Sequence, residues 1–205
     1  MHKLSVQGLS KRFGSRKVFS DISFELVTGK SIAIVGPNGS GKTTLLMTLL
    51  AHYRPTKGTV SYFEDGNQLQ DTDIRARTSL VSPYLFLYDN LTGEENLTFF
   101  ATVSGGYVTG KEINSLLKRV GLEGRGSDPV GAYSSGMKQR LKYAVALLNK
   151  PAYLLLDEPM SNLDNQGKSV VHELVEEYRP HAIILIATNE TEEQSLAGSV
   201  CRVGQ

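Results

Sequence analysis

The stretch GPNGSGKTT, residues 36 to 44, has the residue types of a loop that binds phosphate groups. Gly36, Gly41, Lys42 and Thr43 satisfy the pattern G-x-x-x-x-G-K-[ST], between an apolar strand-like run, SIAIVG, and a segment that predicts a helix. Glycines let backbone N–H groups turn toward phosphate oxygens at a helix amino terminus, whose dipole favours anions. A side chain at Gly39 or Gly41 would intrude on that arrangement.

The lysine and the threonine make the prediction more specific than the glycines do. Lys42 can reach the terminal phosphates of a nucleotide, and the Thr43 hydroxyl can ligate the Mg²⁺ that bridges them. An ordinary glycine-rich turn before a helix would leave both residues without a role. We therefore predict that nucleotide binds to Gly36, Pro37, Asn38, Gly39, Ser40, Gly41, Lys42, Thr43 and Thr44, with Thr43 on the metal.

A pair of carboxylates follows a second apolar run much farther along the chain. The run AYLLLDEP, residues 152 to 159, predicts a buried strand with Asp157 and Glu158 at its carboxyl end, the edge where α/β sheets bind ligands. There Asp157 would hold Mg²⁺ from the outer shell, and Glu158 would polarise the water that attacks the γ-phosphate. The alternative is that both carboxylates cap the next helix. The phosphate loop favours the catalytic interpretation.

Phosphate loops occur in GTPases, small-molecule kinases, helicases and transport ATPases, so other features must separate these classes. A GTPase should carry N-K-x-D to recognise guanine, and the nearest match, NKPA at 149 to 152, lacks the aspartate. The chain has 22 Lys and Arg against 21 Asp and Glu, which indicates neither a nucleic-acid partner nor a polybasic membrane anchor. Its single cysteine, Cys201, excludes an internal disulfide and cysteine-based zinc sites. No run approaches the roughly 20 apolar residues that span a bilayer, so we expect a cytosolic chain unless a partner recruits it.

The elements that must position these residues form an α/β pattern in one domain of 205 residues. KLSVQGL and FSDISFEL alternate like strands of a half-exposed sheet, whereas the runs before the phosphate loop and the carboxylates are wholly apolar. Between about residues 85 and 148 the pattern is helical, with capping boxes in TGEE at 92 and TGKE at 109. The apolar face of the second helix consists of Ile113, Leu116, Leu117 and Val120, before Gly121. We predict a helical subdomain, 85–149, inserted into a nucleotide-binding core, 1–84 and 150–205.

Four motifs follow one another in the order GPNGSGKTT, YSSGMKQR, LLLDEP and SNLD, the last at 161 to 164. In this order and spacing the chain resembles the ATP-binding subunit of an ABC transporter over nearly its whole length. The resemblance implies a P-loop NTPase of ABC type: a mainly parallel core sheet, an antiparallel β subdomain and the inserted helices. It also implies ATP and Mg²⁺ as ligands, and a second ATPase subunit and a transmembrane permease as partners. The expected location is cytoplasmic, on the inner face of the cell membrane.

The resemblance assigns roles to further residues. Phe13, in SKRFGSRKVF, matches the aromatic residue that stacks on adenine; the alternative is a strand residue that faces the core. Ser134, Ser135 and Gly136 fall in the family's signature loop, which binds the γ-phosphate held by a second copy, although Ser135 stands where glycine is commoner. Asp164 matches the residue that communicates across the dimer.

Two positions depart from the family's pattern. A glutamine that touches Mg²⁺ and the attacking water is replaced by Pro83, or by Ser82 if the alignment slips by one residue. A histidine that senses the γ-phosphate is replaced by Asn189, which can donate a hydrogen bond but cannot ionise. We treat Asn189 as a catalytic candidate and expect slow turnover. The alternative is that Asn189 belongs to a plain turn after a strand.

The function expected from these features is ATP hydrolysis that drives a separate permease, in a homodimer rather than with a paralogue. The short chain and YSSGMKQRL are similar to exporter-type ATPases, including the haem exporter of cytochrome c maturation. Aromatic residues just before the helical segment, Tyr84, Leu85, Phe86 and Tyr88, predict the surface for the permease's cytoplasmic helix, unless they are core residues. The rival function is a regulatory or assembly module of ABC type that turns ATP over weakly or not at all.

Overall fold

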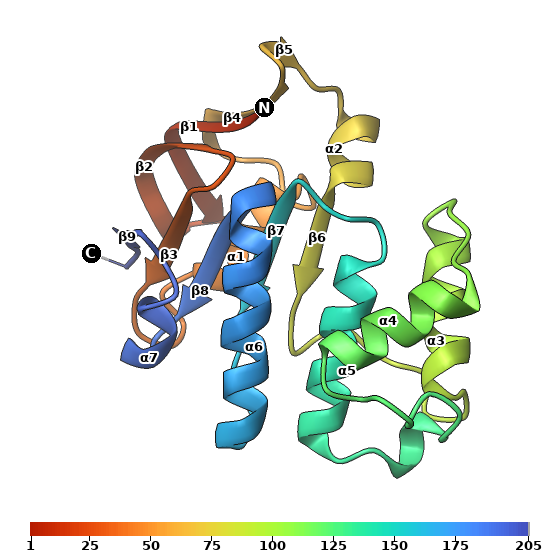
Figure 1. The fold of residues 1–205 in the computed structure, drawn as a ribbon. Helices are drawn as coiled ribbons and strands as arrows, with labels where there is room; N and C mark the ends of the chain where they lie inside the picture. The colour runs from red at the N-terminus through yellow and green to blue at the C-terminus, as the bar shows by residue number, and fades with distance from the viewer. Residues whose placement is uncertain (205) are drawn as a thin grey trace.

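The computed structural model describes residues 1–204 as two sheets and a set of helices (Figure 1). A parallel five-stranded sheet has the order β6-β7-β8-β3-β9, and an antiparallel four-stranded sheet has the order β2-β1-β4-β5. The strands are β1 His2–Phe13, β2 Arg16–Val27, β3 Ser31–Val35, β4 Lys57–Glu64, β5 Asn67–Gln68, β6 Thr78–Val81, β7 Tyr153–Asp157, β8 Ile183–Thr188 and β9 Ser199–Arg202. The helices are α1 Lys42–Leu49, α2 Asp71–Arg77, α3 Gly93–Val103, α4 Gly110–Arg119, α5 Ser135–Leu147, α6 Asn165–Tyr178 and α7 Thr191–Gln194, with 3-10 turns η1 Val130–Ala132 and η2 Arg179–His181. The predicted fold class is confirmed.

The parallel sheet is buried on both faces because its central strands are apolar at nearly every position. Every residue of β3, β7 and β8 is buried. Successive residues of a strand face opposite sides, so Ile183 and Leu185 pack with α1 and the antiparallel sheet. Ile184 and Ile186 pack in the other core, with α6 and the helical segment. Helices on both faces are the usual setting of a parallel sheet.

This arrangement brings the ends of three adjacent strands to one edge of the sheet. Val35 pairs with Thr188, and Asp157 pairs with Ala187, across parallel ladders. The loop that follows β3 and the carboxylates that end β7 are therefore neighbours in space. Ligands bind at this edge of open α/β sheets.

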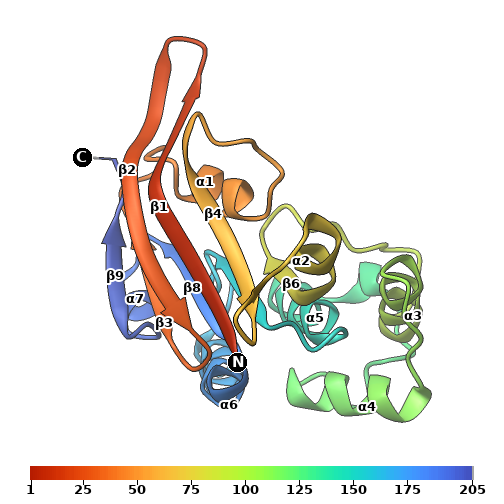
Figure 2. The same ribbon diagram turned by 90° about the horizontal axis from the view of Figure 1, so that it is seen from above.

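The helical segment contains α3, α4 and α5, and Figure 2 shows these helices to one side of the strands β1, β2 and β4. Both predicted capping boxes are confirmed. Thr92 Oγ1 accepts a hydrogen bond from the Glu95 N–H, and the Glu95 carboxylate accepts one from the Thr92 N–H. Thr109 and Glu112 form the same pair of bonds. None of the helices formed by residues 1–204 is long and apolar enough to cross a membrane.

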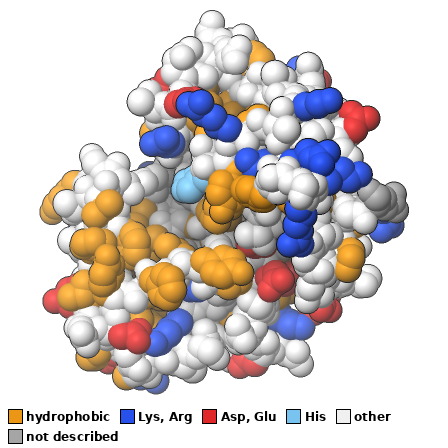
Figure 3. Space-filling model, turned by 180° about the vertical axis from the view of Figure 1, so that it is seen from behind, with side chains coloured by type: hydrophobic (Ala, Val, Ile, Leu, Met, Phe, Trp, Pro, Cys, Tyr) orange, Lys and Arg blue, Asp and Glu red, His pale blue; other side chains and the backbone are white. Residues whose placement is uncertain are grey.

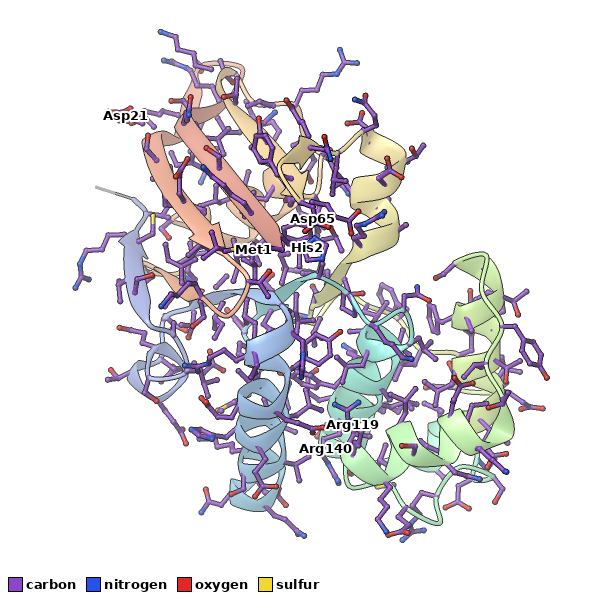
Figure 4. All side chains as sticks on the ribbon, turned by 45° about the horizontal axis from the view of Figure 1, so that its top comes forward. Met1, His2, Asp21, Asp65, Arg119 and Arg140 are labelled. Carbon is purple, nitrogen blue, oxygen red and sulfur yellow. The ribbon has the colours of Figure 1, made fainter. Side chains whose placement is uncertain are left out.

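Two arginines connect the helices of this segment to one another and to α6. Arg140 of α5 donates hydrogen bonds to the carbonyl oxygens of Val120 and Gly121, 3.1 and 2.6 Å away, just after α4. Arg119 of α4 pairs with Glu177 of α6 at 3.2 Å. Figure 4 labels both arginines in the region between α6 and α4. Polar contacts therefore join α5 to the end of α4, and α4 to α6, in addition to the shared core.

Candidate functional site

The loop between β3 and α1 is shaped by glycines in the left-handed region. Gly39 and Gly41 have φ of 80° and 101°. A Cβ at Gly41 would lie 2.4 Å from Val18 Cγ1 of β2, so a side chain there meets a neighbouring strand. α1 begins directly after Gly41, and its free N–H groups and the positive end of its dipole belong to this loop. The loop therefore offers several donors to an anion.

Thr43 Oγ1 donates a hydrogen bond of 2.9 Å to Asp157 Oδ2, although the two residues stand 114 positions apart in the chain. The fold thus brings together the two residues predicted to hold the metal. A hydroxyl and a carboxylate supply the hard oxygen ligands that Mg²⁺ prefers, so the donor set fits this ion. Lys42 lies beside them, only 5% exposed, and its ammonium donates to the carbonyl oxygens of Gly36 and Pro37 at 2.8 and 3.3 Å.

The two carboxylates at the end of β7 lie in different environments. Burial raises the pKa of Asp157, an effect that the Thr43 hydrogen bond opposes and the nearby Glu158 reinforces. Glu158 is only partly buried and has φ of 50°, which is unusual for a residue with a side chain. Its N–H donates to the Ala187 carbonyl oxygen of β8 at 2.9 Å. One carboxylate is thus placed for a metal ion, and the other faces an accessible cavity.

A cavity of about 520 Å³ opens beside the loop. Among the predicted site residues, those that line it are Phe13, Asn38, Gly39, Gly41, Lys42, Thr43, Thr44 and Glu158. Arg16, Val18 and Tyr84 also line it, although no motif of the sequence predicts them as nucleotide contacts. The pairing of Arg16 with Phe13 across the β1–β2 hairpin is a signal that could have identified Arg16. Tyr84 had been assigned only to the permease surface.

Phe13 lies on the cavity wall and not in the core. Its side chain is 48% exposed, so the alternative of a core-facing strand residue is wrong. The ring meets Tyr53 edge to face, with centroids 5.5 Å apart, and the Lys11 ammonium lies 4.7 Å from the Phe13 centroid. An exposed ring held by two neighbours is suited to stacking on a nucleotide base.

The signature loop lies apart from this cavity in the same chain. Ser134 is the N-cap of α5, where its Oγ accepts a hydrogen bond from the Met137 N–H at 3.2 Å. Ser134 and Ser135 are exposed, and Gly136 is partly buried beside the Asn162 carbonyl and Leu163. Within residues 1–204, the cavity lining includes none of 134–136. Ser135 instead lines a separate groove with Pro83 and Asn162.

The two positions that depart from the family pattern also lie outside the described lining of the cavity. Asn189 is exposed directly after β8, next to Thr188, whose hydroxyl accepts a hydrogen bond from the Glu190 N–H at 2.8 Å. Pro83 is exposed, whereas Ser82 is 2% exposed and its Oγ accepts a hydrogen bond from the Tyr84 N–H at 3.1 Å.

A second, mostly apolar hollow of about 380 Å³ lies between α1, α2 and the segment after β6, with Met47, Leu50, Ile74, Tyr84 and Leu85 in its lining. Three of the aromatic residues assigned to a partner surface are exposed: Tyr84 by 67%, Phe86 by 84% and Tyr88 by 48%. The alternative that these three are core residues is wrong, and Leu85 is partly buried. Figure 3 shows hydrophobic side chains gathered around a hollow in this face, with Lys and Arg side chains farther to one side.

Comparison with known proteins points to one family. The ABC transporter family model matches residues 19–161. The chain is 36% identical over 188 residues to the "Uncharacterized ABC transporter ATP-binding protein YxlF" of Bacillus subtilis, covering 91% of this chain and 62% of that protein. It is 34% identical over 202 residues to the "Nod factor export ATP-binding protein I" of Ralstonia nicotianae, covering 97% of this chain and 63% of that protein.

A solved structure agrees with these sequence matches. A putative ABC transporter ATP-binding protein from Pyrococcus furiosus superimposes with a TM-score of 0.85 at 25% identity, covering 98% of this chain and 97% of the other. The chain therefore spans nearly the whole of this structure but less than two thirds of the two curated relatives.

Proposed function

Because this chain belongs to the ABC transporter family, we propose that it binds and hydrolyses ATP as the nucleotide-binding subunit of a transport complex. The observation that carries the proposal is the hydrogen bond of Asp157 to Thr43, a residue that lines the same cavity as Lys42 and Glu158. Phosphate-binding, metal-binding and water-activating groups thus lie side by side, which is what phosphoryl transfer to water needs.

The residues of the site divide the work among themselves. The N–H groups of the loop and of the first turn of α1 bind the phosphates, and Phe13 stacks on the base. Lys42 exchanges its bonds to the Gly36 and Pro37 carbonyl oxygens for bonds to phosphate oxygens. Glu158 accepts a proton from the attacking water as general base. Preorganised N–H groups and the ammonium stabilise the charge that develops on the γ-phosphate.

Mg²⁺ is the metal proposed for this site, held by Thr43 directly and by Asp157 from the outer shell. When bound, this ion would neutralise charge on the phosphates. Asp157 must then be ionised, against the burial that raises its pKa. The cation supplies the compensating charge, so metal and nucleotide should bind together.

A second copy of the chain completes the site in this proposal. The signature residues Ser134, Ser135 and Gly136 open the helix α5 toward solvent and do not belong to the described cavity lining of their own chain. An exposed helix amino terminus with small residues is suited to bind a γ-phosphate that another copy presents. Asp164 caps α6 by accepting a hydrogen bond from the Gly167 N–H, and we propose that it also contacts the second copy. We favour a homodimer over pairing with a paralogue.

The proposed membrane partner is a permease whose cytoplasmic helix docks at the apolar hollow lined by Tyr84 and Leu85, and on the exposed Phe86 and Tyr88 that follow them in the chain. This would place the chain on the inner face of the cell membrane. Export is the favoured direction, supported by the relative named for Nod factor export. The narrower assignment to haem export depends only on the short chain and YSSGMKQRL. Neither relative described above carries that name, so we propose an exporter without specifying its substrate.

The second candidate function is an ABC-type module that uses ATP as a switch and hydrolyses it weakly. It is favoured by Pro83 and Asn189, which replace the family's glutamine and histidine. Both residues also lie outside the described cavity lining. Co-purification with a permease from solubilised membranes would distinguish the two functions.

The test of the proposed function is Glu158→Gln, which removes the general base and keeps the shape of the side chain. We expect the wild type to hydrolyse Mg-ATP, and the variant to bind ATP without hydrolysing it. Size-exclusion chromatography of the variant with saturating Mg-ATP, alone and with the permease, should detect a trapped dimer. Wild-type turnover by Glu158→Gln would contradict the role of Glu158, and a monomer under both conditions would contradict the shared site.

A further inference from the structure

We propose that Tyr143 and Glu193 are positioning residues, which hold the turn after Glu158 and thereby aim that carboxylate at the cavity. The inference rests on the function proposed above for Glu158. Neither residue lines the described cavity, so both would act through the backbone that follows β7. Tyr143 comes from α5, which precedes β7 in the chain, and Glu193 comes from α7, which follows β7 after α6 and β8.

We call Tyr143 and Glu193 together the clamp. Its first half binds the Pro159 carbonyl oxygen. Tyr143 Oη donates to it at 2.8 Å, and Gln139 Nε2 donates to it at 3.3 Å. Both donors come from α5, and their side chains are 1% and 4% exposed. A buried carbonyl that accepts two side-chain bonds is well fixed, because breaking them would leave polar groups unsatisfied.

The second half binds the next residue along the chain. The Met160 N–H donates to Glu193 Oε1 at 2.7 Å, and Glu193 is 4% exposed. Glu193 Oε2 is buried and has no hydrogen-bond partner among residues 1–204. Burying a carboxyl group with half of its acceptors unused costs stability. The bond to the Met160 N–H is directed at the turn that begins with Glu158.

The turn needs such support because its backbone is strained at Glu158. This residue has φ of 50°, and such conformations are unfavourable for a residue with a side chain and persist only where the surroundings enforce them. Its N–H is held by the Ala187 carbonyl oxygen, and its own carbonyl oxygen accepts from the Ser161 N–H at 3.2 Å. The clamp fixes the two residues between these bonds. A misplacement of about 1 Å at a reacting group can cost about 10²-fold in rate.

The clamp also joins the elements that carry two other candidate phosphate contacts. α5 begins at the signature residues 134–136, and α7 begins two residues after Asn189. Each of these helices therefore makes a side-chain hydrogen bond to the backbone just after Glu158. A displacement of either helix would therefore shift the Glu158 carboxylate, although Tyr143 and Glu193 do not contact the nucleotide.

The test uses a matched pair of tyrosines. Tyr143→Phe removes one hydroxyl from Pro159; Tyr178→Phe removes an equivalent one, since Tyr178 Oη donates to the Pro151 carbonyl oxygen at 3.0 Å, before β7. Both tyrosines are buried, at 1% and 8% exposure. We expect Tyr143→Phe to lower kcat about fivefold, the rate equivalent of one hydrogen bond, with little change in KM for ATP. Tyr178→Phe should keep the wild-type kcat, and an equal loss in both variants would overturn the proposal.

Glu193 is tested by a conservative and a disruptive change. Glu193→Gln keeps an oxygen for the Met160 N–H and should retain kcat within about threefold, less than the loss of one hydrogen bond. Glu193→Leu removes the acceptor and should lower kcat by up to about 10²-fold, with KM for ATP changed far less. Equal kcat values for these two variants would overturn the proposed role of the Met160 bond.

Amide hydrogen exchange without nucleotide supplies a measurement independent of activity. Peptides that cover residues 158–163 should exchange faster in Tyr143→Phe and Glu193→Leu than in the wild type, and at the wild-type rate in Tyr178→Phe. Unchanged exchange in both clamp variants would overturn the proposal. Glu158→Gln, assayed in parallel, separates the general-base role of Glu158 from the positioning role of the clamp. An inactive Glu158→Gln beside fully active clamp variants would contradict the clamp alone. An active Glu158→Gln would sink the function of Glu158 itself and the clamp with it.

Discussion

The ammonium group of Lys42 donates a hydrogen bond to the Gly36 carbonyl oxygen, 2.8 Å away, and so bridges the two ends of the phosphate loop. The same group is buried in the wall of the candidate nucleotide cavity. A bound phosphate would compete with the carbonyl oxygen for it. This relationship leads to the first prediction.

Lys42→Ala should abolish the stabilisation of the protein by Mg-ATP, because the variant loses the cation that meets the terminal phosphates. In the wild type, ligand at 100 times its Kd should add about 2.7 kcal/mol to the free energy of unfolding. Thermal unfolding with and without Mg-ATP measures the effect. Lys30→Ala, which removes an exposed lysine, is the control and should keep the shift. A full shift in Lys42→Ala would contradict the site.

Asn189 should be a weakened γ-phosphate contact, and the wild type should therefore turn over slowly. A carboxamide stays neutral, whereas an imidazole titrates near pH 6.5 and can organise both water and phosphate. Asn189→His should raise the ATPase rate, although Pro83 still leaves the site without the family's glutamine. Asn189→Ala should lower the rate, since losing a donor aimed at transition-state charge costs up to about 10²- to 10³-fold. Steady-state ATPase rates of the wild type and both variants, measured with the permease present, test this prediction. Equal rates in all three proteins would show that Asn189 is only a turn residue after β8.

Phe86→Ser should weaken association with the permease, because Phe86 is the most exposed of the aromatic residues proposed for the permease surface, at 84%. Buried aromatic anchors at interfaces commonly contribute about 2 kcal/mol or more. Recovery of the permease by affinity purification from solubilised membranes measures the effect. Val200→Ser, on β9, removes another exposed apolar side chain and should leave recovery unchanged. Equal recovery with Phe86→Ser and with the wild type would argue against this docking surface.

Glu193 should make folding stability depend on pH. Burial raises its pKa above the ordinary 4.5, so the folded protein keeps this proton at pH values where the unfolded chain has lost it. Wild-type stability therefore falls as the pH rises from 4.5 through the raised value, and the cost is complete above it. Glu193→Gln cannot ionise, so its free energy of unfolding relative to the wild type should be larger at about pH 8 than at about pH 4. Chemical denaturation at both pH values measures this difference. Asp157, whose pKa is also raised, is present in both the wild type and Glu193→Gln and so does not contribute to the difference. A stability difference that is independent of pH would contradict the raised pKa of Glu193.

Local features of the chain were predictable from the sequence because their physics is local. The capping boxes at Thr92 and Thr109 depend on residues three positions apart, and both form as expected. The two wholly apolar runs form the strands β3 and β7, in which every residue is buried. The phosphate loop needs only glycines and the start of a helix, which follow one another in the chain.

Contacts between distant segments were decided by the tertiary structure alone. The order of the motifs predicted that Thr43 and Asp157 belong to one site, but only the pairing of β3, β8 and β7 brings them to 2.9 Å. The cavity lining by Tyr84 and the clamp of Tyr143 on the Pro159 carbonyl oxygen could not be predicted. These contacts depend on how helices and loops pack over the sheet, and residue type and periodicity determine which face of an element is buried but not which distant backbone atom it meets. Motifs and hydrophobic patterns were therefore sufficient to predict the fold class and the chemistry of the loop and strand ends, whereas the packing of distant elements sets which side chains surround and hold them.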